Sequence, residues 1–351
     1  MLTDYPAHTV NASITLALGL CLALACAACQ STKATKAQVW RESDPAYVPF
    51  AVTEMVISEN NRFTGLTVDE RTQKSEALSS KELTVYILDL TTGEHRLLGD
   101  GSSALIPTAS EEHDFLYDSS SKSPVVLIKG LQSVRSFAID RGNGVWWNRK
   151  SRMAIFDTAW PQDREGFSAI ALLNTETGDI VSVKLNASSE RLAMCNATGH
   201  FFSESIDTNN ESSAEEFDAS GAFIGRLNSS LAVYSANCRY VLPFSALPAH
   251  GPDDWAIFEA ASRLKLMDFP WSDDPAVDSQ WFSEWNPHYD NLLLTGSEKA
   301  GAAVIDIAQQ KILRRIPDNG APVIFSGDGR ATVTVRDQHI VFDPLPADSL
   351  N

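Results

Sequence analysis

The residues of this 351-residue chain that could do chemistry form no familiar catalytic motif. Gly166-Phe-Ser168 lacks the final glycine of a nucleophile elbow, and the histidines do not follow the paired spacing of a zinc site. The segment from Asp207 to Asp218 has oxygen ligands at alternate positions, as a calcium loop does, but Ser212 stands where that loop needs glycine. We therefore predict no metal and no cofactor, and we leave open whether the chain is an enzyme.

Aromatic and acidic side chains gather in two long polar segments. One segment contains Trp160, and the other contains Trp271, Asp273 and Asp274. Tryptophan among polar residues is typical of surfaces that bind a protein or a glycan. We expect these four residues to bind a partner, and insertions tolerated without a role are the alternative.

Three of the five cysteines lie in an uncharged apolar run, 12–29, which is short for a membrane-spanning helix and long enough for an export signal. Its small residues before Cys29 resemble a bacterial lipoprotein signal, in which that cysteine is lipidated. Ordinary secretory cleavage and an uncleaved anchor stay open as alternatives. The resemblance implies a cell-envelope protein, and Gln30 in place of aspartate favours the outer membrane on its periplasmic side. The alternative location is a secreted protein.

The other two cysteines, Cys195 and Cys238, would then lie in an oxidising compartment. They form either a disulfide or two buried thiols. The net charge of −17, without a basic patch, argues against a nucleic-acid partner.

A unit of short strands and tight turns repeats along the chain. In the clearest copy, 321–343, an apolar strand ends at Phe325, Ser326-Gly-Asp-Gly329 makes a tight turn, and two more short strands follow. Six strand ends are followed by Ser or Asn, namely Ile57, Trp147, Cys195, Tyr234, Trp285 and Phe325. The gap between the first two of these requires a seventh copy, at Ile106.

Successive copies lie 39 to 51 residues apart, which in an all-β chain predicts a seven-bladed β-propeller of four-stranded antiparallel blades. The units resemble WD-repeat blades and their bacterial TolB-like relatives. A pair of β-sandwiches is the alternative, but it does not predict the spacing. Because the last unit lacks a fourth strand, we expect 46–52 to close the ring.

The expected organisation has four parts. Residues 1–29 form a signal helix that ends at the lipidated cysteine, 30–46 a flexible tether, 47–345 the propeller, and 346–351 a C-terminal tail. Large apolar residues at the strand ends, such as Trp147 and Trp285, are expected to form the core between blades.

The long loops are expected to emerge together on one face of the propeller, because they join the second strand to the third, or the fourth strand to the next blade. Loops on a rigid scaffold commonly carry function. We therefore expect a non-catalytic binding or scaffold protein whose partner is an envelope protein or a glycan. The alternative is a propeller-fold hydrolase or lactonase acting at the mouth of the axial channel.

Overall fold

The chain divides into two compact units, Met1–Ala37 and Gln38–Asn351. The computed structural model describes only residues of the second unit: 38–41, 43–71, 83–101, 103–108, 110–119, 124–139, 145–148, 152–157, 167–189, 191–206, 212–227, 232–243, 256–262, 264–268, 281–297, 301–317 and 320–350. Within these residues, no helix is long and apolar enough to cross a membrane. The predicted signal helix lies outside them.

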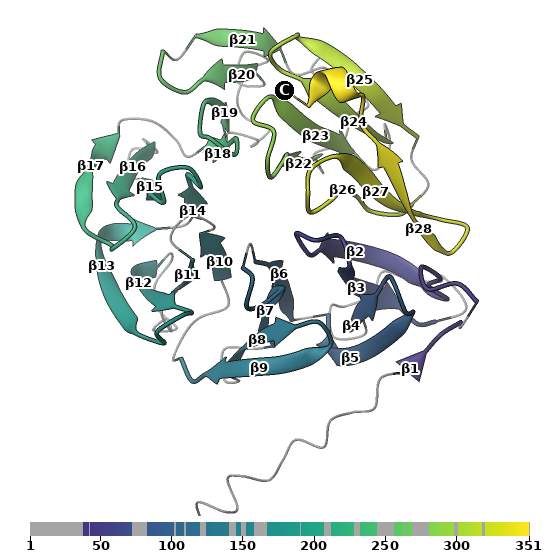
Figure 1. Ribbon diagram of the computed structural model, residues 1–351. Coiled ribbons are helices and arrows are strands. Elements are labelled where there is room, and N and C mark those ends of the chain that lie inside the picture. The colour runs from purple at the N-terminus through teal and green to yellow at the C-terminus, as the bar shows by residue number, and fades with distance from the viewer. Residues whose placement is uncertain are drawn as a thin grey trace, which may run out of the picture. The chain divides into compact units, whose positions relative to one another are not determined.

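The second unit is an all-β propeller of seven antiparallel sheets, and within each blade the strands from the axis outward follow one another in chain order (Figure 1). We call the strands of a blade a to d, from the channel outward. Blade 1 contains β2 (Ala51–Ile57), β3 (Phe63–Asp69), β4 (Thr84–Asp89) and β5 (Glu94–Asp100). Blade 2 contains β6 (Ala104–Pro107), β7 (Phe115–Asp118), β8 (Val125–Lys129) and β9 (Gln132–Phe137).

The next three blades repeat this plan. Blade 3 contains β10 (Val145–Asn148), β11 (Met153–Asp157), β12 (Phe167–Asn174) and β13 (Ile180–Ser189). Blade 4 contains β14 (Arg191–Met194), β15 (Phe201–Ile206), β16 (Ser212–Phe217) and β17 (Phe223–Leu227). Blade 5 contains β18 (Ala232–Tyr234), β19 (Tyr240–Pro243), β20 (Ala256–Glu259) and β21 (Lys265–Asp268).

The last two blades complete the ring. Blade 6 contains β22 (Trp281–Trp285), β23 (Leu292–Ser297), β24 (Gly301–Asp306) and β25 (Lys311–Ile316). Blade 7 contains β26 (Val323–Phe325), β27 (Ala331–Arg336) and β28 (His339–Pro344), and a short 3-10 helix, η3 (Ala347–Ser349), follows it. Five of the c–d strand pairs contain a one-residue β-bulge, which increases the twist of the outer strands, and the pair β12–β13 has a larger register shift near Phe167.

The N-terminal part of the unit closes the ring. Tyr47 pairs with His339 of β28, and the Val48 N–H donates to the Gln338 carbonyl at 2.7 Å, so these residues act as the fourth strand of blade 7. The predicted closing segment 46–52 thus contributes its first three residues, whereas Ala51 and Val52 already belong to β2. Within the expected tether, β1 (Gln38–Val39) pairs with β5 as a fifth strand of blade 1.

One apolar cluster lies in each seam between neighbouring blades. The cluster between blades 2 and 3, for example, joins Leu116 and Phe137 to Trp147 and Phe156. Trp285 belongs to the seam between blades 5 and 6, and Phe325 to the seam between blades 6 and 7. The predicted role of these large strand-end residues in the core between blades is therefore confirmed.

Candidate functional site

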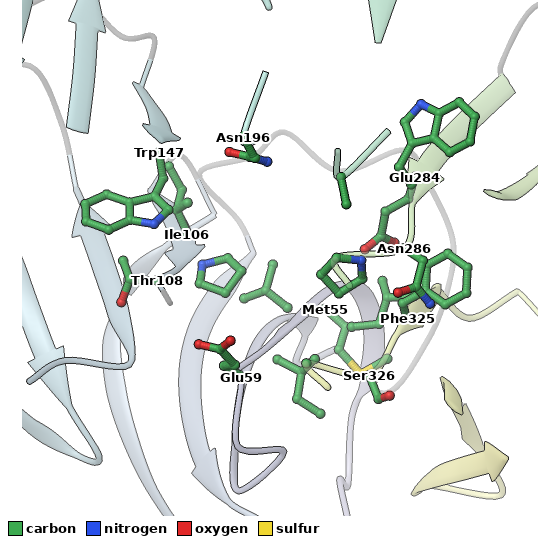
Figure 2. A pocket seen from close by; sticks show the side chains of 18 of the residues that line it. Met55, Glu59, Ile106, Thr108, Trp147, Asn196, Glu284, Asn286, Phe325 and Ser326 are labelled. Carbon is green, nitrogen blue, oxygen red and sulfur yellow. The ribbon is translucent and has the colours of Figure 1, made fainter. Parts of the chain in front are cut away.

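The site that the structure describes is a cavity of about 420 Å³ on the axis of the ring. Every blade contributes to its wall, through the end of strand a or the a–b turn that follows (Figure 2). One residue from each blade, in order, is Met55, Ile106, Trp147, Asn196, Tyr234, Glu284 and Phe325. The cavity therefore lies at the end of the channel where the a–b turns meet, and we call it the axial pocket.

The serines of the repeated turn hold the chain in place around the pocket. Ser58 Oγ accepts a hydrogen bond from the Phe63 N–H at 2.9 Å, and Ser326 Oγ accepts one from the Ala331 N–H at the same distance. Ser235 does the same within its own turn. These bonds satisfy donors that a tight turn would otherwise leave unpaired, which is why Ser recurs at this position.

The asparagines have a different role, because they join one turn to the next. Asn148 Nδ2 of blade 3 donates to the Gly199 carbonyl of blade 4 at 2.8 Å. Asn286 Nδ2 of blade 6 donates to the Gly329 carbonyl of blade 7 at 2.7 Å. The Gly327 N–H of blade 7 then donates to Asn61 Oδ1 of blade 1 at 2.7 Å.

A disulfide between Cys195 and Cys238 joins the turns of blades 4 and 5. The two cysteines, for which the sequence leaves a disulfide and free thiols open, are thus bonded. Together with the asparagine bonds, the disulfide links the a–b turns of blades 3, 4 and 5 and those of blades 6, 7 and 1. Links of this kind restrain the spacing of the pocket walls.

Two of the described residues that line the pocket carry a carboxyl group, Glu284 from β22 and Glu59 from the turn after β2. Glu284 is only partly accessible to water, and this burial raises its pKa to about 7, although the Phe325 backbone N–H opposes the shift. Glu59 Oε1 lies 3.6 Å from His288 Nε2, and that nitrogen also lies 2.9 Å from the Gly327 carbonyl oxygen. Because a carbonyl can only accept, His288 Nε2 carries the proton.

Trp147 adds a polar group without a partner. Its side chain is 6% exposed, and its indole Nε1 has no hydrogen-bond partner among the described residues. Figure 2 shows the nitrogen on the side of the ring that faces the pocket. Buried donors are nearly always paired, so this one is available to a bound acceptor.

The pocket combines apolar walls with a few polar groups, the composition expected of a ligand site. Its apolar part comes from side chains such as Met55, Ile106 and Phe325. Of the described residues that line it, none is Lys, Arg or His. Nowhere in the described part of the chain do three or more His, Cys, Asp or Glu side chains gather as a metal site.

The residues that the sequence singles out for partner binding, Trp160, Trp271, Asp273 and Asp274, lie outside the described residues, as does Cys29. The sequence does not single out Glu284. The signal that could have found it is an acidic residue inside the strand 281–285, which also holds two tryptophans and a phenylalanine, at a position adjoining the predicted core residue Trp285.

No family model matches the chain, and no curated protein matches it. Among solved structures, the chain is similar to the hydrazine synthase of Kuenenia stuttgartiensis, with a TM-score of 0.54 and 13% sequence identity. The match covers 91% of this chain and 99% of that one. At this identity the likeness supports the propeller fold and nothing about activity.

Proposed function

We propose that this chain is a binding protein of the bacterial cell envelope, anchored to the outer membrane through a lipid on Cys29, and that a partner protein binds in its axial pocket. One observation supports the pocket: all seven blades build it, and its volume of about 420 Å³ is within the range of pockets that enclose a ligand. The linked turns around it favour a preformed site, which reduces the ordering cost of binding.

The long-loop face, with Trp160, Trp271, Asp273 and Asp274, is the second surface of this proposal. It rests on sequence alone. In an up-and-down blade, the b–c loops emerge at the opposite end from the a–b turns, so the two surfaces make separate predictions. We take the axial pocket as the main binding site, because the structure describes its lining residues and their contacts.

Site-specific photo-crosslinking in intact cells tests the proposal. A photoreactive amino acid at Ala236, which lines the pocket, should give a discrete adduct with one envelope protein. The matched control is Ala261, which is exposed in the c–d turn of the same blade and should give none. An adduct formed at Trp160 or Trp271 but not at Ala236 would move the binding site to the long-loop face.

The lipid anchor has its own test. Cys29→Ala should leave an unprocessed precursor, and mass spectrometry of the native protein should find acyl chains on a mature N-terminal cysteine. A mature N-terminus elsewhere, without lipid, would contradict this part of the proposal and support the secreted alternative.

A propeller-fold hydrolase or lactonase is the second candidate, and Glu284 is the observation that favours it. A carboxyl whose pKa is about 7 can act as a general acid or base near neutral pH. In that case Glu284→Gln should abolish turnover of chromogenic glycosides or lactones, whereas the surface variant Glu94→Gln should keep it. Equal rates in both variants would contradict an enzymatic role of this carboxyl.

A further inference from the structure

We propose that the axial pocket binds a basic side chain, Lys or Arg, carried on an extended segment of the partner protein. The inference rests on the proposed function, because it names the chemistry of the ligand for the same pocket. Three observations support it: the charge of the pocket, its unpaired donor and its walls.

Charge complementarity gives the sign of the ligand. Glu59 and Glu284 both line the pocket, and none of the described lining residues is Lys, Arg or His. His288 contacts Glu59, whereas no charged group among the described residues acts on the Glu284 carboxyl. A ligand cation would fill that role, since a buried carboxylate is strongly stabilised by an opposite charge.

The unpaired donor indicates that the cation arrives with an acceptor. Trp147 Nε1 is buried at the pocket wall without a hydrogen-bond partner among the described residues. A peptide segment supplies both groups at once, because its side chain carries the charge and its backbone carbonyls accept hydrogen bonds. A bare metal ion or a simple amine would supply only the charge.

The walls suit the stem of such a side chain. Lys and Arg bury their methylene groups against apolar surface while the charged end reaches a polar partner. Met55, Ile106 and Phe325 provide that surface, and in Figure 2 Glu284 lies on the same side of the pocket as Phe325, with Ile106 on the opposite side. The cavity of about 420 Å³ is larger than one side chain, so flanking backbone can enter as well.

Binding of the cation should be linked to a proton at Glu284. The free protein holds this carboxyl partly protonated at neutral pH, because its pKa is raised to about 7, and a bound cation favours the ionised form. Affinity should therefore rise from pH 6 to pH 8. The other titratable groups at the site are Glu59 and Tyr234, which line the pocket, and His288 beside Glu59.

The test is calorimetric titration of the whole protein with two capped pentapeptides, Gly-Gly-Lys-Gly-Gly and the same peptide with norleucine in place of lysine. We expect the lysine peptide to bind about tenfold more tightly or better, as a charge-assisted hydrogen bond requires. Glu284→Gln should remove most of that preference, and Glu59→Gln a smaller part. Glu94→Gln, which replaces an exposed carboxyl group on β5, should leave it unchanged.

The outcomes separate the two proposals. The inference would be overturned by any of three results: equal binding of both peptides, an equal loss of the lysine preference in Glu284→Gln and Glu94→Gln, or no saturable binding of the lysine peptide. The gain in affinity between pH 6 and pH 8 should be larger in the wild type than in Glu284→Gln, and an equal gain would also contradict it. A photo-crosslink at Ala236 combined with any of these results would leave the binding function standing and remove only its preference for a cation.

Discussion

The seam between blades 4 and 5 should depend on its disulfide more than on its core. Among the described residues, its cluster has three buried members, Ala193, Cys195 and Phe202, whereas every other seam has five or more. The bond joins residues separated by 43 positions. The loop-entropy relation for that separation gives a stabilisation of about 4 kcal/mol.

Cys238 adds a second effect that can be measured separately. Its φ is 59°, in the left-handed region, and the equivalent turn positions hold Asn61 and Gly329. A residue with a Cβ at this φ costs about 1 kcal/mol relative to glycine. The double variant Cys195→Ala/Cys238→Ala should therefore lose about 4 kcal/mol, and Cys195→Ala/Cys238→Gly only about 3 kcal/mol.

Urea unfolding followed by tryptophan fluorescence measures both differences. Reduction of the wild type with dithiothreitol should lower its stability nearly as far as the alanine pair does. A loss below about 1 kcal/mol in the alanine pair would refute the view that the bond compensates for a small apolar seam. Equal stability of the two double variants would refute the strain assigned to Cys238.

Three further predictions concern the ring and its pocket. Val48→Asp places a charge at a fully buried position of the closing strand and should cost about 3 kcal/mol or more of stability. Val39→Asp, at a position 39% exposed, should not. Equal melting temperatures of the two variants would contradict closure of the ring by this strand. Asn286→Ala leaves the Gly329 carbonyl and two turn N–H groups without their partner and should cost about 2 kcal/mol of stability in urea unfolding. A loss within experimental error would contradict the role of Asn286 in linking the two turns. The pKa of Glu284 is raised from 4.5 to about 7, so the folded state holds the proton more tightly and wild-type stability falls as pH rises through that window. Glu284→Gln should therefore gain stability relative to wild type at pH 8 but not at pH 4. An equal difference in stability at both pH values would contradict the raised pKa.

The repeat could be predicted because a single turn, with Ser or Asn at its first position, recurs at the channel end of most blades. Two copies are shifted by one residue. In blade 2 the turn begins at Thr108, after Pro107 and not after Ile106, and in blade 4 Cys195 itself begins the turn, since its N–H bonds to the His200 carbonyl. Threonine and cysteine replace the expected serine at these sites, so the pattern alone misplaces the strand end.

The pocket was harder to predict from the sequence. Strand alternation shows that the side chains of 281–285 point to two sides, but it does not show which side faces a neighbouring blade and which the channel. The sequence therefore predicts Trp285 as core and does not distinguish Glu284. It also leaves the disulfide open, because the pairing of Cys195 with Cys238 depends on two turns that only the ring brings together.

The closing strand also sets the order in which the chain can become complete. Tyr47 and Gln338 are 291 residues apart in sequence and in contact in the fold. Contacts of such separation form slowly, because the intervening chain must first be ordered. Blade 7 thus lacks its outer strand until the other six blades bring the N-terminal segment around, and its edge strand β28 is open to wrong pairing during that interval. Folding of this propeller should end with the pairing of one of the first segments of the unit to be synthesised, and that late step is where a folding factor would have the most to protect.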